Sequence, residues 1–469
     1  MTDSTVGQES SQAETRQLRF PGMVGIFLGF SLCLHLAAIV YFVFGDTIEA
    51  ATCFLTGQFF LGLSILRLID GAWVFQDIRL FFLVFFFLYG GTLPLVVVFG
   101  WAGGISGIAE AALMYGTGIL GFNIVQWWFK WPWHDVPHSV FARIRPSFAN
   151  AVVVFLGFAW VAYYAASRGI HFSLTIDRGQ VQFIGTQAWV VSMFVVNGFV
   201  MYMMAGWGQL SRNARIILVV SVTAFILFQV SLGNRRDFMP MFIFLAGIVA
   251  TKRHAIVRAG TVALGVVAFV GLTVLGVLRQ VIANPMLLAS NVSDLLITQN
   301  EFVSPIQTLM YYVLKPRPLR LGWTYLSAPS LFIPRAFWPE KPESLSLQFM
   351  RDAFGAVNMM GYAYTPVTEA YLNFGWVGPF IVLSLLSLGM IKLVKHADAH
   401  PGLYFICFAL VVDFNRGDFG GLFYSVVCVG AAYWLMSQVS RLTWVPSAWR
   451  STWQPPAEPF SSRNTAPGF

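Results

Sequence analysis

The sequence predicts an all-α polytopic membrane protein with about twelve transmembrane helices and a large loop outside the membrane. Of its 469 residues, 57% are hydrophobic and only 11% are charged, and the mean hydropathy is +0.68. Soluble domains carry about 25% charged residues. Apolar runs of about 20 residues, the length that crosses a bilayer, recur along most of the chain. One long internal segment, 315–379, interrupts them with prolines, charges and aromatic side chains.

Both ends of the sequence are polar. Residues 1–20 contain acidic side chains and precede the first apolar run, so we expect a disordered cytoplasmic tail rather than a cleavable signal sequence. Residues 446–469 predict a second cytoplasmic tail. Between the tails we expect transmembrane helices 1–9 within 21–282, a periplasmic cap loop at 283–370, and helices 10–12 within 371–445.

Each predicted helix is an apolar run with polar or basic residues at its ends. The helices are expected near 23–44, 47–69, 79–99, 104–129, 147–167, 184–208, 216–232, 238–251, 259–282, 374–394, 402–414 and 419–440. The runs at 238–251 and 402–414 are short enough to be half-helices.

The cap loop is expected to be ordered rather than a flexible linker. Its segments 303–314 and 345–354 have helical spacing of apolar and aromatic residues, which suits short helices on the membrane surface. Six prolines between 316 and 342 break the remainder into turns and extended pieces.

Basic residues favour a cytoplasmic N-terminus. With that orientation every inner connection carries Lys or Arg, as the positive-inside rule requires. These residues are Arg67, Arg79, Lys130, Arg143, Arg145, Arg212, Arg215, Lys252, Arg253, Arg258, Lys392, Lys395 and Arg441. The cap loop then faces the periplasm, and the protein is expected in the bacterial inner membrane.

Basic residues also occur on the outer side, where the same rule disfavours them on short connections. The outer cations are Arg168, Arg178, Arg235, Arg236, Arg279, Lys315, Arg317, Arg320, Arg335, Lys341, Arg351 and Arg416. Each of them has an alternative partner in an outer acid or a lipid phosphate. As a set they favour an anionic ligand.

Two short outer turns carry arginine. In the turn Gly233–Asp237, two adjacent guanidiniums at the membrane surface suit a diphosphate, because arginine binds phosphate oxygens bidentately. The alternative is a turn whose arginines are held by Asp237. The turn Asp413–Asp418 is similar, but its acids are placed to neutralise Arg416.

Several function classes have no support in the sequence. The GxGxxG pattern at Gly116–Gly121 lies in an apolar run without a preceding strand, so it predicts helix packing rather than a dinucleotide site. No Walker A, HExxH or GxSxG sequence occurs. The four cysteines lack metal-ligand spacing. We therefore expect no metal and no other cofactor. The net charge of +8 follows the membrane topology, so we expect no nucleic-acid binding.

Three segments resemble a known family. They are GNRRD at 233–237, IPRAFWPEKP at 333–342 and EAYLNFGWVGP at 369–379, and they resemble the bacterial O-antigen polymerase (Wzy-like) family of oligosaccharide repeat-unit polymerases. The resemblance implies a metal-independent, GT-C-like glycosyltransferase of surface polysaccharide synthesis. It would transfer the growing glycan from undecaprenyl diphosphate to the terminal sugar of an incoming lipid-linked repeat unit at the periplasmic face. Membrane lipids, a chain-length regulator and a flippase are the further partners implied.

Site roles follow from this resemblance. Diphosphate binding is expected from Arg235, Arg236, Arg279, Lys341 and Arg416, and catalysis from Arg335 and Glu369. Glu369 is the candidate general base where the loop re-enters the membrane, and an acid favoured by the helix dipole is the alternative. Glycan binding is expected from Trp323, Tyr325, Trp338, Tyr362, Tyr364 and Asn373. For the aromatic residues, anchoring at the membrane interface is the alternative.

Two other functions remain as alternatives. An O-antigen ligase would use the same donor with a lipid A-core acceptor. A transporter or flippase of lipid-linked oligosaccharide would only bind the substrate, and Glu110 within an apolar run suits a proton relay. No clear inverted repeat supports the transporter.

Overall fold

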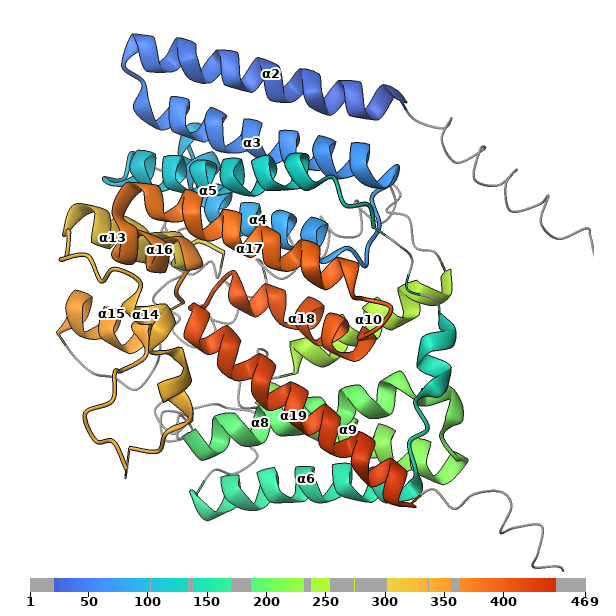
Figure 1. Cartoon of the computed structure of the whole chain (residues 1–469). Helices are drawn as coiled ribbons and strands as arrows, with labels where there is room; N and C mark the ends of the chain where they lie inside the picture. Colours follow the sequence, from blue (N-terminus) through green and yellow to red (C-terminus); the bar gives the residue numbers. More distant parts are fainter. Residues whose placement is uncertain are drawn as a thin grey trace, which may run out of the picture.

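The computed structural model describes residues 21–101, 103–133, 136, 138–169, 187–231, 238–253, 274, 302–335, 337–355 and 363–443. Within these ranges every regular element is a helix (Figure 1). Nine helical segments of the described part are long and apolar enough to cross a membrane. The prediction of an all-α polytopic membrane protein is therefore confirmed.

The long apolar helices form most of the bundle. They are α2 (Pro21–Phe44), α3 (Thr47–Asp70), α4 (Ile78–Val98), α5 (Ile108–Phe129), α6 (Phe148–Ser167), α8 (Gln187–Ala205), α9 (Arg212–Ser231), α17 (Gly378–Lys395) and α19 (Phe419–Thr443). Two shorter apolar helices are α10 (Met239–Arg253) and α18 (Pro401–Phe414). Each predicted transmembrane helix coincides with one of these, except the one at 259–282, of which the structure describes only residue 274.

The cap loop contains short helices. They are α13 (Ser304–Leu314), α14 (Trp323–Leu326), η5 (Ala328–Phe332) and α15 (Leu345–Phe354). The two helices predicted at 303–314 and 345–354 are thus present. The chain re-enters the bundle through α16 (Pro366–Phe374) and the single turn η6 (Gly375–Val377), which lead into α17. The span therefore begins earlier than the predicted 374, and α16 crosses the expected boundary at residue 370. Two further 3₁₀ turns, η1 (His138–Arg143) and η3 (Trp207–Gln209), lie between bundle helices.

Local sequence signals set several helix ends. Ser147 and Asn150 form a reciprocal capping box at the start of α6. At α16, the Thr365 hydroxyl accepts from the backbone N–H of Val367, and Pro366 occupies the first turn, where no donor is needed. Gly71 ends α3 in the left-handed conformation that suits glycine.

The bundle has two main apolar cores. The larger packs α3, α4, α5, α17 and α18 around buried aromatic rings such as Phe82, Phe122 and Phe408. The second packs α6, α8 and α9 against α19. Helix α10 lies between them and contacts α18 of the larger core and α8 of the second (Figure 1).

The glycines of the GxGxxG pattern pack helices against one another. A Cβ at Gly116 would lie 2.6 Å from the ring of Phe54 on α3, and one at Gly121 would lie 2.5 Å from the carbonyl oxygen of Phe380 on α17. Helix α5 therefore fits closely between α3 and α17 because these positions lack side chains. The predicted role in helix packing is confirmed.

The cap elements gather at one end of the bundle. In Figure 1, α13, α14 and α15 lie at the left, whereas the start of α2 and the end of α19 lie at the opposite end. Helix α13 packs on α4, α5 and α16, and η5 packs on α19. The cap is thus built onto the ends of several bundle helices. The side of the membrane that it faces stays a prediction.

Candidate functional site

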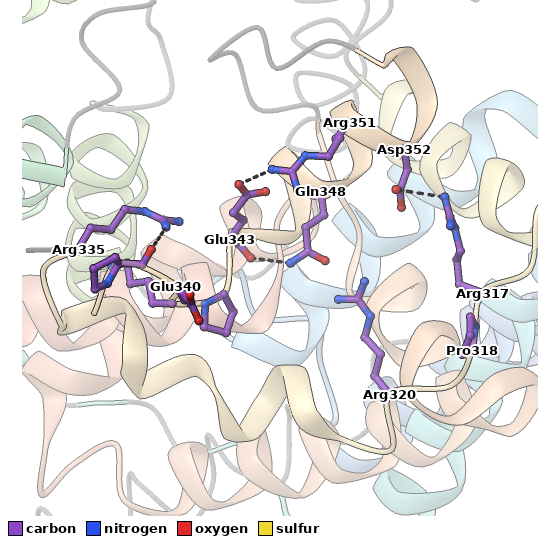
Figure 2. A pocket seen from close by; sticks show the side chains of 12 residues that line it. Arg317, Pro318, Arg320, Arg335, Glu340, Glu343, Gln348, Arg351 and Asp352 are labelled. Atoms are coloured by element: carbon purple, nitrogen blue, oxygen red, sulfur yellow. Dashed lines mark hydrogen bonds and ion pairs between the residues drawn. The ribbon is translucent and has the colours of Figure 1, made fainter. Parts of the chain in front are cut away.

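A polar pocket of about 630 Å³ lies within the cap (Figure 2). We call it the cap pocket. Five cationic and three acidic side chains line it, which gives a net charge of +2. The lining residues are Arg317, Pro318, Arg320, Arg335, Pro339, Glu340, Lys341, Pro342, Glu343, Gln348, Arg351 and Asp352.

Two ion pairs brace the walls of the cap pocket. A guanidinium nitrogen of Arg317 lies 3.1 Å from a carboxylate oxygen of Asp352, and Arg351 pairs with Glu343. Gln348 also donates to the backbone carbonyl of Glu343 at 2.8 Å. Both ion pairs are partly exposed, so each contributes little stability, about 0–1 kcal/mol. Their main consequence is that two arginines already have carboxylate partners.

The two cations of the IPRAFWPEKP segment hold that segment folded. The Lys341 ammonium donates to the carbonyl oxygens of Ile333 at 2.8 Å and of Leu331 at 3.3 Å. Arg335 donates to the carbonyl oxygen of Pro339 at 3.0 Å. Burial, together with the Arg335 charge, lowers the pKa of Lys341 below its ordinary value of 10.5. Residues 331–335 and 337–341 are thus held in a folded conformation along the pocket.

Arg320 is directed into the cap pocket (Figure 2). Its backbone N–H donates to the carbonyl oxygen of Leu372 at 3.0 Å, which anchors its position to α16. Burial raises the pKa of Tyr312 and of Tyr364, and the nearby Arg320 charge opposes part of this shift. Among the described residues, no hydrogen bond or ion pair engages its guanidinium. Arg320 is therefore the pocket cation best placed to receive an anion.

Glu369 lies on α16 and does not line the cap pocket. Only 1% of its surface is exposed. One carboxylate oxygen accepts from the Thr324 hydroxyl and the other from the backbone N–H of Phe419, each at 2.6 Å. Asn373 donates to the Thr324 hydroxyl at 2.7 Å and accepts from the N–H of Gly322 at 3.0 Å. These contacts, which we call the Glu369 network, join the Arg320 segment and the start of α19 to α16.

The four aromatic residues that were expected to bind glycan and that the structure describes lie outside the pocket lining. Tyr364 is fully buried, and burial raises the pKa of Tyr364 and of Tyr325. Tyr325 stacks on Phe374 with ring centroids 6.3 Å apart. Trp323 and Trp338 are exposed.

The remaining predicted residues divide into two groups. Arg416 follows α18, and its carbonyl oxygen accepts from the N–H of Tyr364 at 3.2 Å. Arg235, Arg236, Arg279 and Tyr362 lie outside the described residues.

The structure thus places two of the predicted site residues, Arg335 and Lys341, in one pocket. It places Glu369 and Asn373 in the adjoining network. Sequence reasoning counted Arg320 among the outer cations but did not assign it to the site. Its charge in the outer loop was the available signal, although several neighbours share that charge.

Comparison with known proteins identifies a family. The family model described as O-antigen polysaccharide polymerase Wzy matches residues 180–435, more than half of the chain. The matched range includes the cap pocket, α16 and the Glu369 network. No curated protein and no solved structure gives a significant match.

Proposed function

We propose a specific reaction for this chain, which belongs to the O-antigen polysaccharide polymerase Wzy family. In this reaction the growing glycan is transferred from undecaprenyl diphosphate to the terminal sugar of an incoming lipid-linked repeat unit. The reaction takes place at the periplasmic face of the bacterial inner membrane and needs no metal. The enzyme is a glycosyltransferase of the GT-C type. A flippase would deliver the repeat units, and a chain-length regulator would act as a partner.

The main support for this proposal is the positive charge of the cap pocket. A diphosphate leaving group needs fixed positive charge where its own negative charge develops. The pocket has a net charge of +2, and the Arg320 guanidinium is directed into it without a carboxylate partner among the described residues. Arg335 supplies a second guanidinium on the opposite wall (Figure 2). Planar guanidiniums match phosphate oxygens bidentately.

The bond changes define what the protein must supply. The acceptor hydroxyl oxygen attacks the anomeric carbon of the donor sugar, and the bond from that carbon to the diphosphate oxygen breaks. The bonding electrons leave with the diphosphate, and Arg320 and Arg335 stabilise the resulting charge. We also assign Arg235, Arg236, Arg279 and Arg416 to diphosphate binding, on the basis of the sequence alone.

The hydroxyl proton requires an acceptor, and Glu369 is the proposed base. Its carboxylate is buried and does not line the cap pocket, so proton transfer requires that the Glu369 network open to admit the acceptor hydroxyl. The alternative role of Glu369 is to position the segment that carries Arg320. Glu369→Gln and Thr324→Val separate the two roles. If Glu369 is the base, only Glu369→Gln should be inactive, and it should be inactive over the whole pH range. If Glu369 only positions the Arg320 segment, both variants should weaken donor binding.

The test is chain extension by the purified full-length protein in lipid vesicles, with a lipid-linked repeat unit as donor and acceptor. Arg320→Ala should slow extension by about 10²–10³-fold, the usual effect of removing one donor to a developing anion. Arg320→Lys should recover only part of the rate, because it keeps the charge but loses the planar fork.

Lys315→Ala is the matched control. Lys315 belongs to the same loop, but it lies over the Tyr311 ring and does not line the cap pocket. This variant should extend chains normally. Normal extension by Arg320→Ala would remove the cap pocket from the reaction. Product formed only on added lipid A-core would support a ligase, and translocation without bond formation would support a transporter.

A further inference from the structure

The segment Leu319–Leu326 has one polar face and one apolar face. Arg320 is directed into the cap pocket, and Thr324 is buried against Glu369. Three large apolar side chains of the same segment are exposed instead: Leu321 by 76%, Trp323 by 58% and Leu326 by 74%. Exposing such a row of large apolar side chains to water is energetically unfavourable.

Leu321 adds a second observation. Its backbone lies in the left-handed region, with φ at 49°. This conformation costs a residue with a Cβ roughly 1–2 kcal/mol and favours glycine or asparagine. A water-facing turn would gain from either substitution. A leucine at this position indicates that its apolar side chain has a partner that repays the strain.

The apolar face continues directly onto a membrane-spanning segment. Leu321 donates its backbone N–H to the carbonyl oxygen of Asn373 at 3.0 Å, and Asn373 lies within the apolar span Pro366–Lys395. The turn after α16 exposes Trp376 and Val377. The next exposed side chains on α17 are Phe380, Ile381 and Leu385, on a helix long and apolar enough to cross the bilayer.

We propose that Leu319–Leu326 and Trp376–Val377 form a ledge that lies in the outer interface of the bilayer. Tryptophan beside leucine at the end of a span suits this depth. The ledge sets Arg320 at the level of the lipid phosphates. A diphosphate-linked lipid then reaches the cap pocket sideways, with its hydrocarbon chain still in the membrane. The identity of the lipid rests on the proposed function, but the position of the ledge does not.

The depth of the ledge is measured with spin labels on the full-length protein in lipid vesicles. The native residues Cys33, Cys53, Cys407 and Cys428 are replaced by alanine, and single cysteines are introduced as Leu326→Cys and Val377→Cys. Both labels should be more accessible to lipid-soluble oxygen than to a water-soluble nickel chelate. Glu340→Cys, on the pocket wall of the same loop, is the matched control and should show the opposite preference.

Greater nickel access at residues 326 and 377 would overturn the ledge. Protection of both labels from both reagents would also overturn it, because a protein surface would then cover this face. Neither readout depends on polymerase activity, so failure of the ledge and failure of the proposed reaction are distinguishable.

A second variant tests the sideways route. Leu326→Glu should lower chain extension from a long-chain lipid donor by about tenfold, which corresponds to about 1.4 kcal/mol. With a short-prenyl diphosphate donor supplied in detergent, the same variant should match the wild type, because that donor needs no bilayer route. Equal loss with both donors would overturn the route.

Discussion

At the scale of single residues, the turn from α16 into α17 depends on two glycines. Gly375 adopts φ 65° and ψ −147°, a combination that essentially only glycine reaches. A Cβ at Gly378 would lie 2.1 Å from the carbonyl oxygen of Ala370. The FGWVGP segment is therefore explained by backbone geometry. This turn carries the end of α16 and with it Asn373 of the Glu369 network.

Gly378→Ala should lower the thermal unfolding midpoint of the purified protein clearly, because its Cβ meets a backbone atom that cannot rotate away. Gly389→Ala in the same helix is the matched control, since a Cβ there would meet no atom within 4 Å. This control should be neutral or stabilising by about 0.5–1 kcal/mol, because alanine suits a helix interior better than glycine. Equal midpoints for the two variants would show that α16 and α17 are not packed as described.

Sequence reasoning reached only part of the candidate site. Arg335 and Lys341 belong to a distinctive proline-rich segment, and both line the cap pocket. Arg320 was not distinguished from its charged neighbours, because its direction is fixed by a backbone hydrogen bond to α16, far along the chain. No local spacing reveals such a contact. The hydrogen bonds to Glu369 likewise come from residues far from it in the sequence, the Thr324 hydroxyl and the backbone N–H of Phe419 at the start of α19.

At the scale of elements, a buried ion-pair cluster joins α3, α4 and the end of α5. Arg79 is fully buried, with guanidinium nitrogens 2.9 Å from carboxylate oxygens of both Asp70 and Asp77. It also donates to the carbonyl oxygen of Trp131 at 2.7 Å. In the sequence, Arg79 is one of the basic residues on the inner connections that indicate the orientation of the protein in the membrane. The structure shows that its charge also fastens three helices together.

Arg79→Met should destabilise the protein by about 3–5 kcal/mol, because it leaves two buried carboxylates without their partner. Arg317→Met is the control from a partly exposed pair and should cost about 0–1 kcal/mol. Adding Asp70→Asn and Asp77→Asn to Arg79→Met should restore part of the lost stability. The measurement is unfolding of the purified protein in mixed micelles. Wild-type stability of Arg79→Met alone would contradict the description of this cluster.

The helices themselves were largely predictable. Each apolar run needs internal hydrogen bonds in lipid, so its length and ends translate directly into a helix. Which helices contact one another was not predictable, because apolar runs of similar composition do not indicate their neighbours in the bundle. The close contact of α5 with α17 through Gly121 is one example.

At the scale of the whole molecule, the bundle has two distinct ends. The cap occupies one, and the end of α17 with its exposed Lys392 lies at the other (Figure 1). The sequence predicts that the cap end faces the periplasm.

Single cysteines in the same cysteine-free protein test this orientation in cells. Glu340→Cys should react with a membrane-impermeant thiol reagent once the outer membrane is permeabilised. Lys392→Cys should react only after the inner membrane is broken. Labelling of residue 392 in cells with an intact inner membrane would reverse the predicted orientation.

The two-faced segment at 319–326 also limits how the loop can change in length. Successive backbone N–H groups of Arg320 and Leu321 are matched to the carbonyl oxygens of Leu372 and Asn373. Inserting or deleting one residue within 319–326 would break the match between this pairing and the hydrogen bond from Thr324 to Glu369. We therefore expect related chains to keep the spacing from 319 to 326 fixed, while the loop tolerates changes of length elsewhere.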